Sequence, residues 1–149
     1  MKNKKKQFIP KCVEKYKGRY PIIPRSTWER SFMQWLDLNP GVIEWSSESV
    51  IIYYYDPIRK RKRRYYPDFM AKILNKDDKI VKYIIEIKPE HETKPPIITK
   101  GKSTKTLQYQ KITYITNQAK WKSAENYCKK MGIYFKVLTE FQLFKGKTK

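Results

Sequence analysis

The sequence has little cysteine and no long apolar run. Its two cysteines, Cys12 and Cys128, form no CxxC pair and stand beside no histidine cluster, which argues against a disulfide framework and against zinc. No stretch of about 18 apolar residues occurs, and the lysine-rich start at residues 1–6 is not followed by an apolar signal segment. We therefore expect a protein that stays in a cytoplasm, binds no zinc and does not associate with a membrane.

Acidic residues are also scarce. The 149 residues include 34 Lys and Arg but only 14 Asp and Glu, for a formal net charge of +20. Such an excess indicates a polyanionic partner, because each neutralised phosphate releases condensed counterions. Nucleic acid fits best, with a ribosomal-type RNA binder or a lipid-surface binder as alternatives.

The strongest basic run follows Asp56-Pro57, which favours a basic loop between strands over a membrane-binding amphipathic helix. We predict that this run contacts the DNA backbone. Its six consecutive members are Arg59, Lys60, Arg61, Lys62, Arg63 and Arg64.

The length supports one compact domain with its own core. Hydrophobic residues make up 40% of the chain and aromatic residues 15%, too many for a disordered basic tail. Residues 1–24 are lysine-rich, carry three prolines and show no sustained period, so we expect an extended basic arm outside the core. Residues 25–149 are predicted to form the single domain.

Hydrophobic spacing predicts the order of elements within that domain. A helix is expected from Ser26 to Asn39, followed by strands at 50–55, about 64–74 and about 80–88. The polar loop 75–79 joins the last two strands as a hairpin. After a proline-rich loop, a second helix is expected to end at Gly132, and a final strand spans 134–138. The predicted fold is α/β, in the order helix, three strands, helix, strand.

Two carboxylates are predicted to face each other in this hairpin. Strand alternation puts Glu86 and Lys88 on one face. If Leu74 and Ile80 close the loop, the residue opposite Asp68 is Glu86. Like charges at directly opposed positions are unfavourable. Lys88 offsets part of this repulsion, and a hard divalent metal held by both carboxylates offsets the rest.

Pro67-Asp68 and Glu86-Ile87-Lys88 together resemble the PD…ExK signature of the restriction-endonuclease-like nucleases, the PD-(D/E)XK superfamily. That superfamily has a core in the same order of elements. The resemblance implies that Asp68 and Glu86 hold Mg²⁺, with Mn²⁺ as a substitute, and that Lys88 orients or activates the attacking water. It also implies that Glu29, on the first helix, completes the catalytic site. Metal-assisted phosphodiester hydrolysis needs a Lewis acid on the phosphoryl oxygen, a nucleophilic water and a cation near the developing charge, so the implied chemistry is coherent.

A closer resemblance covers most of the chain. It is carried by Arg25-Ser26-Thr27-Trp28-Glu29, Arg64-Tyr65-Tyr66-Pro67-Asp68-Phe69, Glu86-Ile87-Lys88-Pro89, Thr93-Lys94-Pro95-Pro96 and Asn117-Gln118-Ala119-Lys120-Trp121. These segments are similar to the head-completion nucleases of T-even-type tailed bacteriophages. The resemblance implies action on packaged double-stranded DNA before tail joining, with phage head or neck proteins as partners. The implied location is the host cytoplasm or the head–tail junction of the virion.

Other interpretations remain open at this point. Ser26-x-x-Glu29 is also a helix capping box, and Glu86 with Lys88 is also a plausible surface ion pair. Glu86 lies inside an apolar run, however, where burial of a charge is unfavourable unless the charge is paired or binds a cation. Lys120, on the second helix, is predicted to face the site or DNA.

Two alternative functions follow from these readings. One is a catalytically inert DNA-binding or head–tail joining protein that keeps the nuclease fold. The other is the endonuclease subunit of a heteromeric transposase, which shares the motif but is usually longer and has a C-terminal DNA-binding domain. Asp68, Glu86 and Lys88 favour an active nuclease over the inert protein, and the shorter chain without that C-terminal domain favours the phage nuclease over the transposase subunit.

Overall fold

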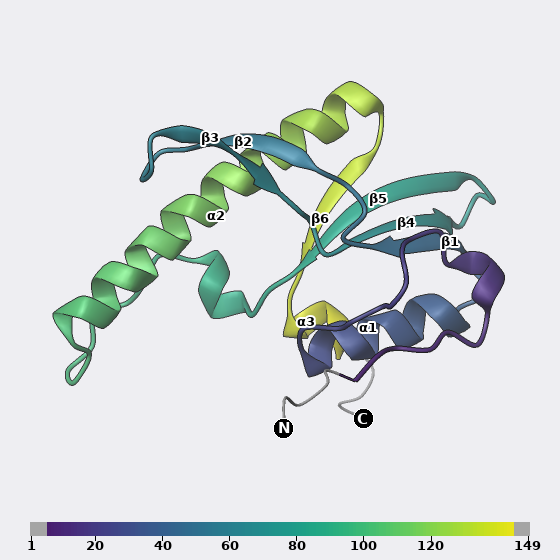
Figure 1. Cartoon of the computed structure of the whole chain (residues 1–149), viewed down its shortest axis with the longest axis horizontal. Coiled ribbons are helices and arrows are strands. Elements are labelled where there is room, and N and C mark those ends of the chain that lie inside the picture. The colour runs from purple at the N-terminus through teal and green to yellow at the C-terminus, as the bar shows by residue number, and fades with distance from the viewer. Residues whose placement is uncertain (1–5, 145–149) are drawn as a thin grey trace.

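A four-stranded sheet forms the centre of the computed structural model, which describes residues 6–144 (Figure 1). Its strand order is β1 (Val42–Ser47), β4 (Phe69–Leu74), β5 (Ile80–Ile87) and β6 (Tyr134–Leu138). The β1–β4 and β4–β5 pairs are antiparallel, whereas β6 runs parallel to β5. A return strand parallel to its neighbour requires a crossover, which a long helix supplies here.

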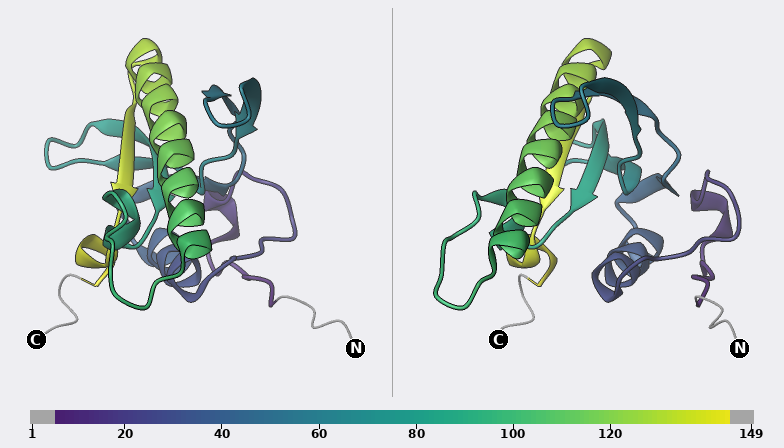
Figure 2. Two further views of the ribbon diagram at one scale, coloured as in Figure 1. Left: turned by 90° about the vertical axis from the view of Figure 1, so that its left-hand side faces the viewer. Right: turned by 60° about the vertical axis from the view of Figure 1, so that its left-hand side comes forward.

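Helices pack on the two faces of this sheet (Figure 2). Helix α1 (Thr27–Leu38) buries Phe32, Met33 and Leu36 in one core cluster, which also contains Ile85 of β5. Helix α2 (Thr104–Met131) buries Trp121 in a second cluster with Ile84. Adjacent residues of β5 therefore enter different cores, as strand alternation requires. Gly132 ends α2 in the left-handed conformation (φ 69°), which confirms the predicted helix end.

The predicted α/β order of helix, three strands, helix, strand is confirmed for the core, but two of the strands differ from those expected. The first strand of the sheet is β1, which was not predicted. The expected strand at 50–55 corresponds to β2 (Ile52–Asp56), which pairs with β3 (Arg61–Tyr65) in a separate two-stranded ribbon. This ribbon is an insertion between β1 and β4.

The expected single strand at 64–74 is therefore wrong. The chain leaves the ribbon after Tyr65 and enters the main sheet at Phe69, with Pro67 between the two strands. Proline has no N–H to continue a ladder, so a break at this point is physically expected. The basic run is also more ordered than a loop, because residues 61–64 belong to β3.

Residues 6–24 are extended, but their predicted position outside the core is wrong. Phe8, Tyr16 and Ile22 are buried in the same cluster as Trp45 of β1. The Tyr16 and Trp45 rings pack edge to face with centroids 4.7 Å apart. Single apolar residues in an extended chain produce no helical or strand period, which explains why the sequence pattern concealed this packing. Residues 1–5 of the expected arm, and 145–149 of the expected domain, lie outside the described residues.

Three short helical segments complete the fold: η1 (Val13–Lys15), η2 (Glu90–Thr93) and α3 (Glu140–Leu143). The backbone N–H of Glu90 donates to the Glu140 carboxylate at 2.7 Å, so α3 holds the segment that follows β5. Among residues 6–144, no helix is both long and apolar enough to cross a membrane.

Candidate active site

Asp68 and Glu86 lie side by side at one end of the β4–β5 hairpin. The ladder runs from Leu74 opposite Ile80 to Phe69 opposite Ile85, which confirms the predicted register. Asp68 precedes β4 by one residue, and its backbone N–H donates to Glu86 Oε2 at 3.3 Å. Its own carboxylate accepts a hydrogen bond from the Ile87 N–H at 2.8 Å. The hairpin backbone thus positions both acids.

Glu86 is buried with incomplete charge compensation. Its Oε2 accepts a hydrogen bond from the Tyr65 hydroxyl at 2.8 Å, and Lys88 Nζ lies 4.0 Å from Oε1. Burial, followed by the neighbouring charge of Asp68, raises the pKa of Glu86 to about 8. Burial also raises the pKa of Asp68, although the Ile87 N–H and the Lys88 charge oppose this shift. A positive charge arriving between the two carboxylates would relieve both penalties.

Glu29 brings a third carboxylate toward the same place from the first turn of α1. Ser26 caps this helix by accepting a hydrogen bond from the Glu29 N–H at 3.1 Å, and the Ser26 hydroxyl lies 3.4 Å from Glu29 Oε2. Burial, then the charges of Asp68 and Glu48, raises the pKa of Glu29 to about 7. Helix capping and proximity to the site therefore coexist at this position.

Glu48 is a fourth acidic residue in this region, and sequence reasoning did not assign it to the site. We refer to Glu29, Glu48, Asp68 and Glu86 together as the acidic cluster. It directly follows β1 with a positive φ of 50°, and its backbone N–H donates to the Asp68 carbonyl at 3.0 Å. Arg25 binds both of its carboxylate oxygens, at 2.8 and 3.1 Å. Since β1 itself was not predicted, no sequence signal placed the residue after it beside Asp68.

Lys120, on α2, lies beside the two buried tyrosines of the ribbon, and its predicted role at the site or in DNA binding stays a prediction. Its Nζ lies 5.8 Å from the ring centroid of Tyr54 and 5.6 Å from that of Tyr65, the residue that binds Glu86. Burial lowers the pKa of Lys120, while the charge of Glu86 opposes that shift. Trp121 belongs to the core, as expected.

The six predicted DNA-binding residues at 59–64 do not share one surface. Arg59 and Arg63 bind the buried carboxylate of Asp56, at 3.0 and 3.3 Å, and so help build the ribbon turn. Arg59 is nevertheless exposed, as are Lys60, Arg61, Lys62 and Arg64, whereas Arg63 is partly buried. The run therefore combines two contacts that build the ribbon turn with five solvent-exposed cations.

Comparison with known proteins connects this geometry to a family. Residues 39–140 match the family described as TnsA-like endonuclease N terminal. The chain is also 39% identical over 148 residues to the head completion nuclease of Enterobacteria phage T4, covering 94% of this chain and 96% of that protein. The chain belongs to the head completion nucleases. No solved structure gives a significant match.

Membership of the head completion nucleases agrees with the fold. TnsA-like endonuclease domains have the restriction-endonuclease-like fold, so the predicted fold class is confirmed. The matched region runs from the start of β1 to α3 and contains Asp68, Glu86 and Lys88. Glu29 lies before this region but within the relative's near-complete coverage.

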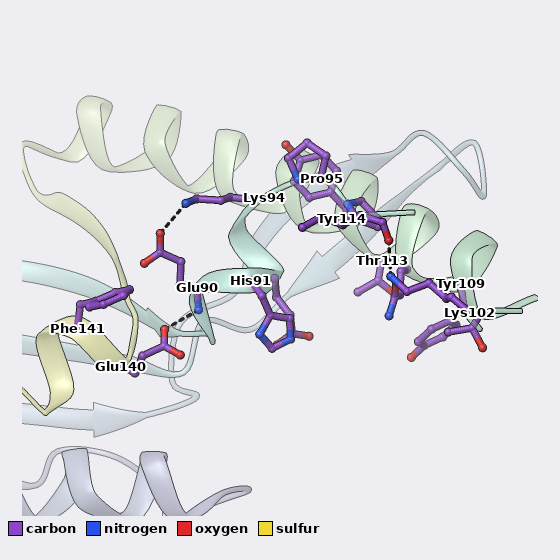
Figure 3. Close-up of a pocket in the computed structure, with 15 residues that line it drawn as sticks. Glu90, His91, Lys94, Pro95, Lys102, Tyr109, Thr113, Tyr114, Glu140 and Phe141 are labelled. Carbon is purple, nitrogen blue, oxygen red and sulfur yellow. Dashed lines mark hydrogen bonds and ion pairs between the residues drawn. The ribbon is translucent and has the colours of Figure 1, made fainter. Parts of the chain in front are cut away.

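A pocket of about 910 Å³ lies apart from the carboxylates of this head completion nuclease (Figure 3). It is enclosed by η2 and the following loop, the first half of α2, and α3. Glu90, paired with Lys94 at 2.9 Å, and Phe141 are among its lining residues. None of Glu29, Asp68, Glu86 and Lys88 lines it, so this pocket is not the candidate active site.

The carboxylates of the site have the donor chemistry for a hard divalent cation. Within residues 6–144, no group of three or more His, Cys, Asp or Glu side chains is arranged so that it could hold a metal ion by itself. Mg²⁺ commonly uses one or two protein carboxylates and completes its octahedral shell with water and substrate phosphate. The adjacent carboxylates of Asp68 and Glu86 fit that open arrangement.

Proposed function

We propose that this nuclease hydrolyses DNA phosphodiester bonds with Mg²⁺ held by Asp68 and Glu86, and with Mn²⁺ as a functional substitute. The observation that carries the proposal is the convergence of the buried Glu86 and partly buried Asp68 carboxylates, which are oriented by the Tyr65 hydroxyl and the Ile87 N–H and have Lys88 as a partial counter-charge. When bound, the metal supplies Lewis-acid polarisation of a phosphoryl oxygen.

The protein groups around this pair have distinct proposed roles. Lys88 orients the attacking water and stabilises the negative charge that develops on the phosphate, because its ammonium lies on the same side as Glu86. Glu29, with its pKa near 7, is suited to accept or release a proton near neutral pH. Lys120, which reaches toward this region from α2, is proposed to contact a DNA phosphate.

The exposed basic residues of the ribbon are proposed to bind the DNA backbone without reading sequence. The net charge of +20 supports this, as do the five exposed cations of the 59–64 run. Phosphate contacts of this kind position DNA but carry no sequence information. We therefore expect selection of DNA by structure or ends.

The biological setting is proposed from the named relative. The T4 protein is a head completion nuclease, and the alignment spans nearly all of both chains. We propose that the present protein acts on packaged DNA during phage head completion, in the host cytoplasm or at the head–tail junction, with head or neck proteins as partners. This end-to-end match favours head completion over the transposase-subunit alternative.

A supercoiled-plasmid assay tests the proposed chemistry. Incubation with Mg²⁺ should convert the plasmid to nicked or linear forms, and removal of divalent metal by EDTA should stop the conversion. Mn²⁺ should restore it after EDTA is removed by dialysis. Retention of supercoiled DNA in Mg²⁺ and Mn²⁺, together with normal DNA binding, would instead identify the catalytically inert DNA-binding protein.

A further inference from the structure

The outer face of the β2–β3 ribbon presents aromatic and cationic side chains to solvent. Tyr53 is opposite Arg64, and Tyr55 is opposite Lys62, so all four project from the same face of the ribbon. The two tyrosines are 52% and 61% exposed. The alternate residues of β2, including Tyr54, are buried against the second core.

These exposed tyrosines do not contribute to either core. The inner face of the ribbon already supplies Ile52, Tyr54 and Tyr65 to the packing against α2. Aromatic side chains that stay exposed on a two-stranded ribbon gain no free energy from the burial of apolar surface. A role in binding therefore explains Tyr53 and Tyr55 better than a role in folding.

Cations accompany the exposed rings. Lys62 Nζ lies 4.9 Å from the centroid of the Tyr53 ring. The Arg64 guanidinium donates hydrogen bonds to the Tyr66 and Tyr53 hydroxyls, and these contacts raise the pKa of Arg64. Interleaved aromatic and basic groups attract a polyanion through its phosphates and offer flat surfaces to its bases.

The ribbon that bears this outer face is connected to the candidate active site. Its inner face contacts the site through the Tyr65 hydroxyl, which donates a hydrogen bond to Glu86. Tyr66 is half-exposed and precedes Asp68 by two residues. The ribbon and the first carboxylate therefore belong to one continuous segment of chain.

We infer that this outer face is a stacking platform for unpaired nucleotides, which makes the enzyme selective for DNA with single-stranded segments or frayed ends. Same-face residues of an antiparallel strand repeat about every 6.8 Å, twice the rise of about 3.4 Å per nucleotide in a stacked strand. Paired duplex bases already stack on one another and gain little from Tyr53 and Tyr55. Unpaired bases gain a stacking partner. This inference refines the proposed function by naming its substrate class.

Equilibrium binding without divalent metal tests the platform. A fluorescently labelled oligothymidylate and a blunt duplex of equal length would be titrated with wild type and with the double variant Tyr53→Leu/Tyr55→Leu. We expect the variant to bind the single strand on the order of ten-fold more weakly, the usual scale for lost base stacking. Binding to the duplex should be nearly unchanged.

Two controls make the result specific. The double variant Tyr53→Phe/Tyr55→Phe keeps the rings and should retain single-strand affinity. Tyr109→Leu removes a tyrosine that is 71% exposed on α2, away from the ribbon, and should change neither affinity. Equal losses on both substrates, or no loss on the single strand, would overturn the platform. Binding is measured without cleavage, whereas the plasmid assay tests hydrolysis, so the two proposals fail independently.

Discussion

Asp56 and Glu86 are both buried carboxylates of one very basic chain, but their surroundings differ. Asp56 accepts hydrogen bonds from the N–H groups of Ile58 and Arg59, at 2.9 and 3.0 Å, and from the guanidinium groups of Arg59 and Arg63. Its burial opposes ionisation, yet these hydrogen bonds outweigh that cost and hold its pKa well below the ordinary value.

Glu86 has weaker partners and a like-charged neighbour. One hydroxyl, one backbone N–H at 3.3 Å and a lysine 4.0 Å away face it, and its pKa is raised instead of lowered. The protein thus neutralises Asp56 internally and leaves Glu86 and Asp68 to be neutralised from outside. The contrast separates an acid that builds the fold from acids suited to bind a cation.

The sharpest test of this contrast removes the charges of the acidic pair. We expect Asp68→Asn and Glu86→Gln each to abolish plasmid cleavage in Mg²⁺, because the metal loses a ligand. Each change also relieves repulsion, so the metal-free melting temperature should stay constant or rise slightly. Asp77→Asn, in the exposed β4–β5 turn, is the matched control and should cleave normally. A clear fall in melting temperature would make the pair structural.

The next effect concerns Lys88, the cation nearest to Glu86. Lys88→Ala should slow single-turnover cleavage on the order of 10²–10³-fold, the typical loss for one preorganised electrostatic partner. DNA affinity should hardly change, since the chain has 34 Lys and Arg. Lys82→Ala changes a lysine on the same face of β5 and serves as control. Normal turnover at saturating DNA with a reduced salt dependence would make Lys88 a phosphate anchor.

Asp56 should show the opposite behaviour to Glu86. Asp56→Asn leaves Arg59 and Arg63 without their carboxylate and weakens the ribbon turn. We expect a clear fall in melting temperature, with cleavage by the folded protein retained at low temperature and saturating DNA. A variant that melts normally but cannot cleave would remove the distinction between the two acids.

The acidity of the two regions predicts opposite responses to pH. The pKa values of Glu29 and Glu86 are raised from 4.5 to about 7 and about 8, so the folded state holds their protons longer than the unfolded chain. The stabilisation that these two groups add to the free energy of unfolding is fully present below about pH 4.5, and it is lost as the pH rises through 7 to 8. The contribution of Asp56 is lost only in acid. Metal-free unfolding in urea from pH 5 to 9 should show falling stability, and Glu86→Gln should flatten the decline.

The smallest effects are expected at the ribbon cations. Replacing Arg61, Arg63 and Arg64 with Ala should weaken binding to all DNA sequences similarly. Each lost phosphate contact should reduce the slope of log affinity against log salt by about 0.9 on duplex DNA. Arg63→Ala alone should also lower the melting temperature, because it binds Asp56. Sequence-dependent losses would reveal base reading at the ribbon.

Local patterns predicted the hairpin register and the helix order well. The five-residue loop between Leu74 and Ile80 fixed which residues face each other, so the approach of Asp68 to Glu86 followed by counting. Glu29 was assigned to the site through the superfamily resemblance, whereas the local pattern after Ser26 predicted the helix cap that the structure contains. The catalytic roles of these residues remain predictions.

Features that depend on distant partners were not predictable in this way. The ribbon and the main sheet meet in sequence at Pro67, and the prediction of one strand over 64–74 overlooked this proline because apolar and aromatic residues stand on both sides of it. Glu48 approaches Asp68 only because β1 pairs with β4. Phe8 and Ile22 contribute to the core one at a time, without a period, because extended chain buries isolated side chains against Trp45 and its neighbours.

The ribbon leaves and re-enters the fold at nearly the same point, since the Glu48 N–H donates to the Asp68 carbonyl at 3.0 Å. The intervening residues 49–67 form an insertion whose two ends lie together beside the acidic cluster. Changes of length within this insertion need not disturb the pairing of β1 with β4. The same segment carries Tyr65, whose hydroxyl donates to Glu86, so a ribbon exchanged for another must keep a hydrogen-bond donor at this position if the arrangement of the acidic pair is to be preserved.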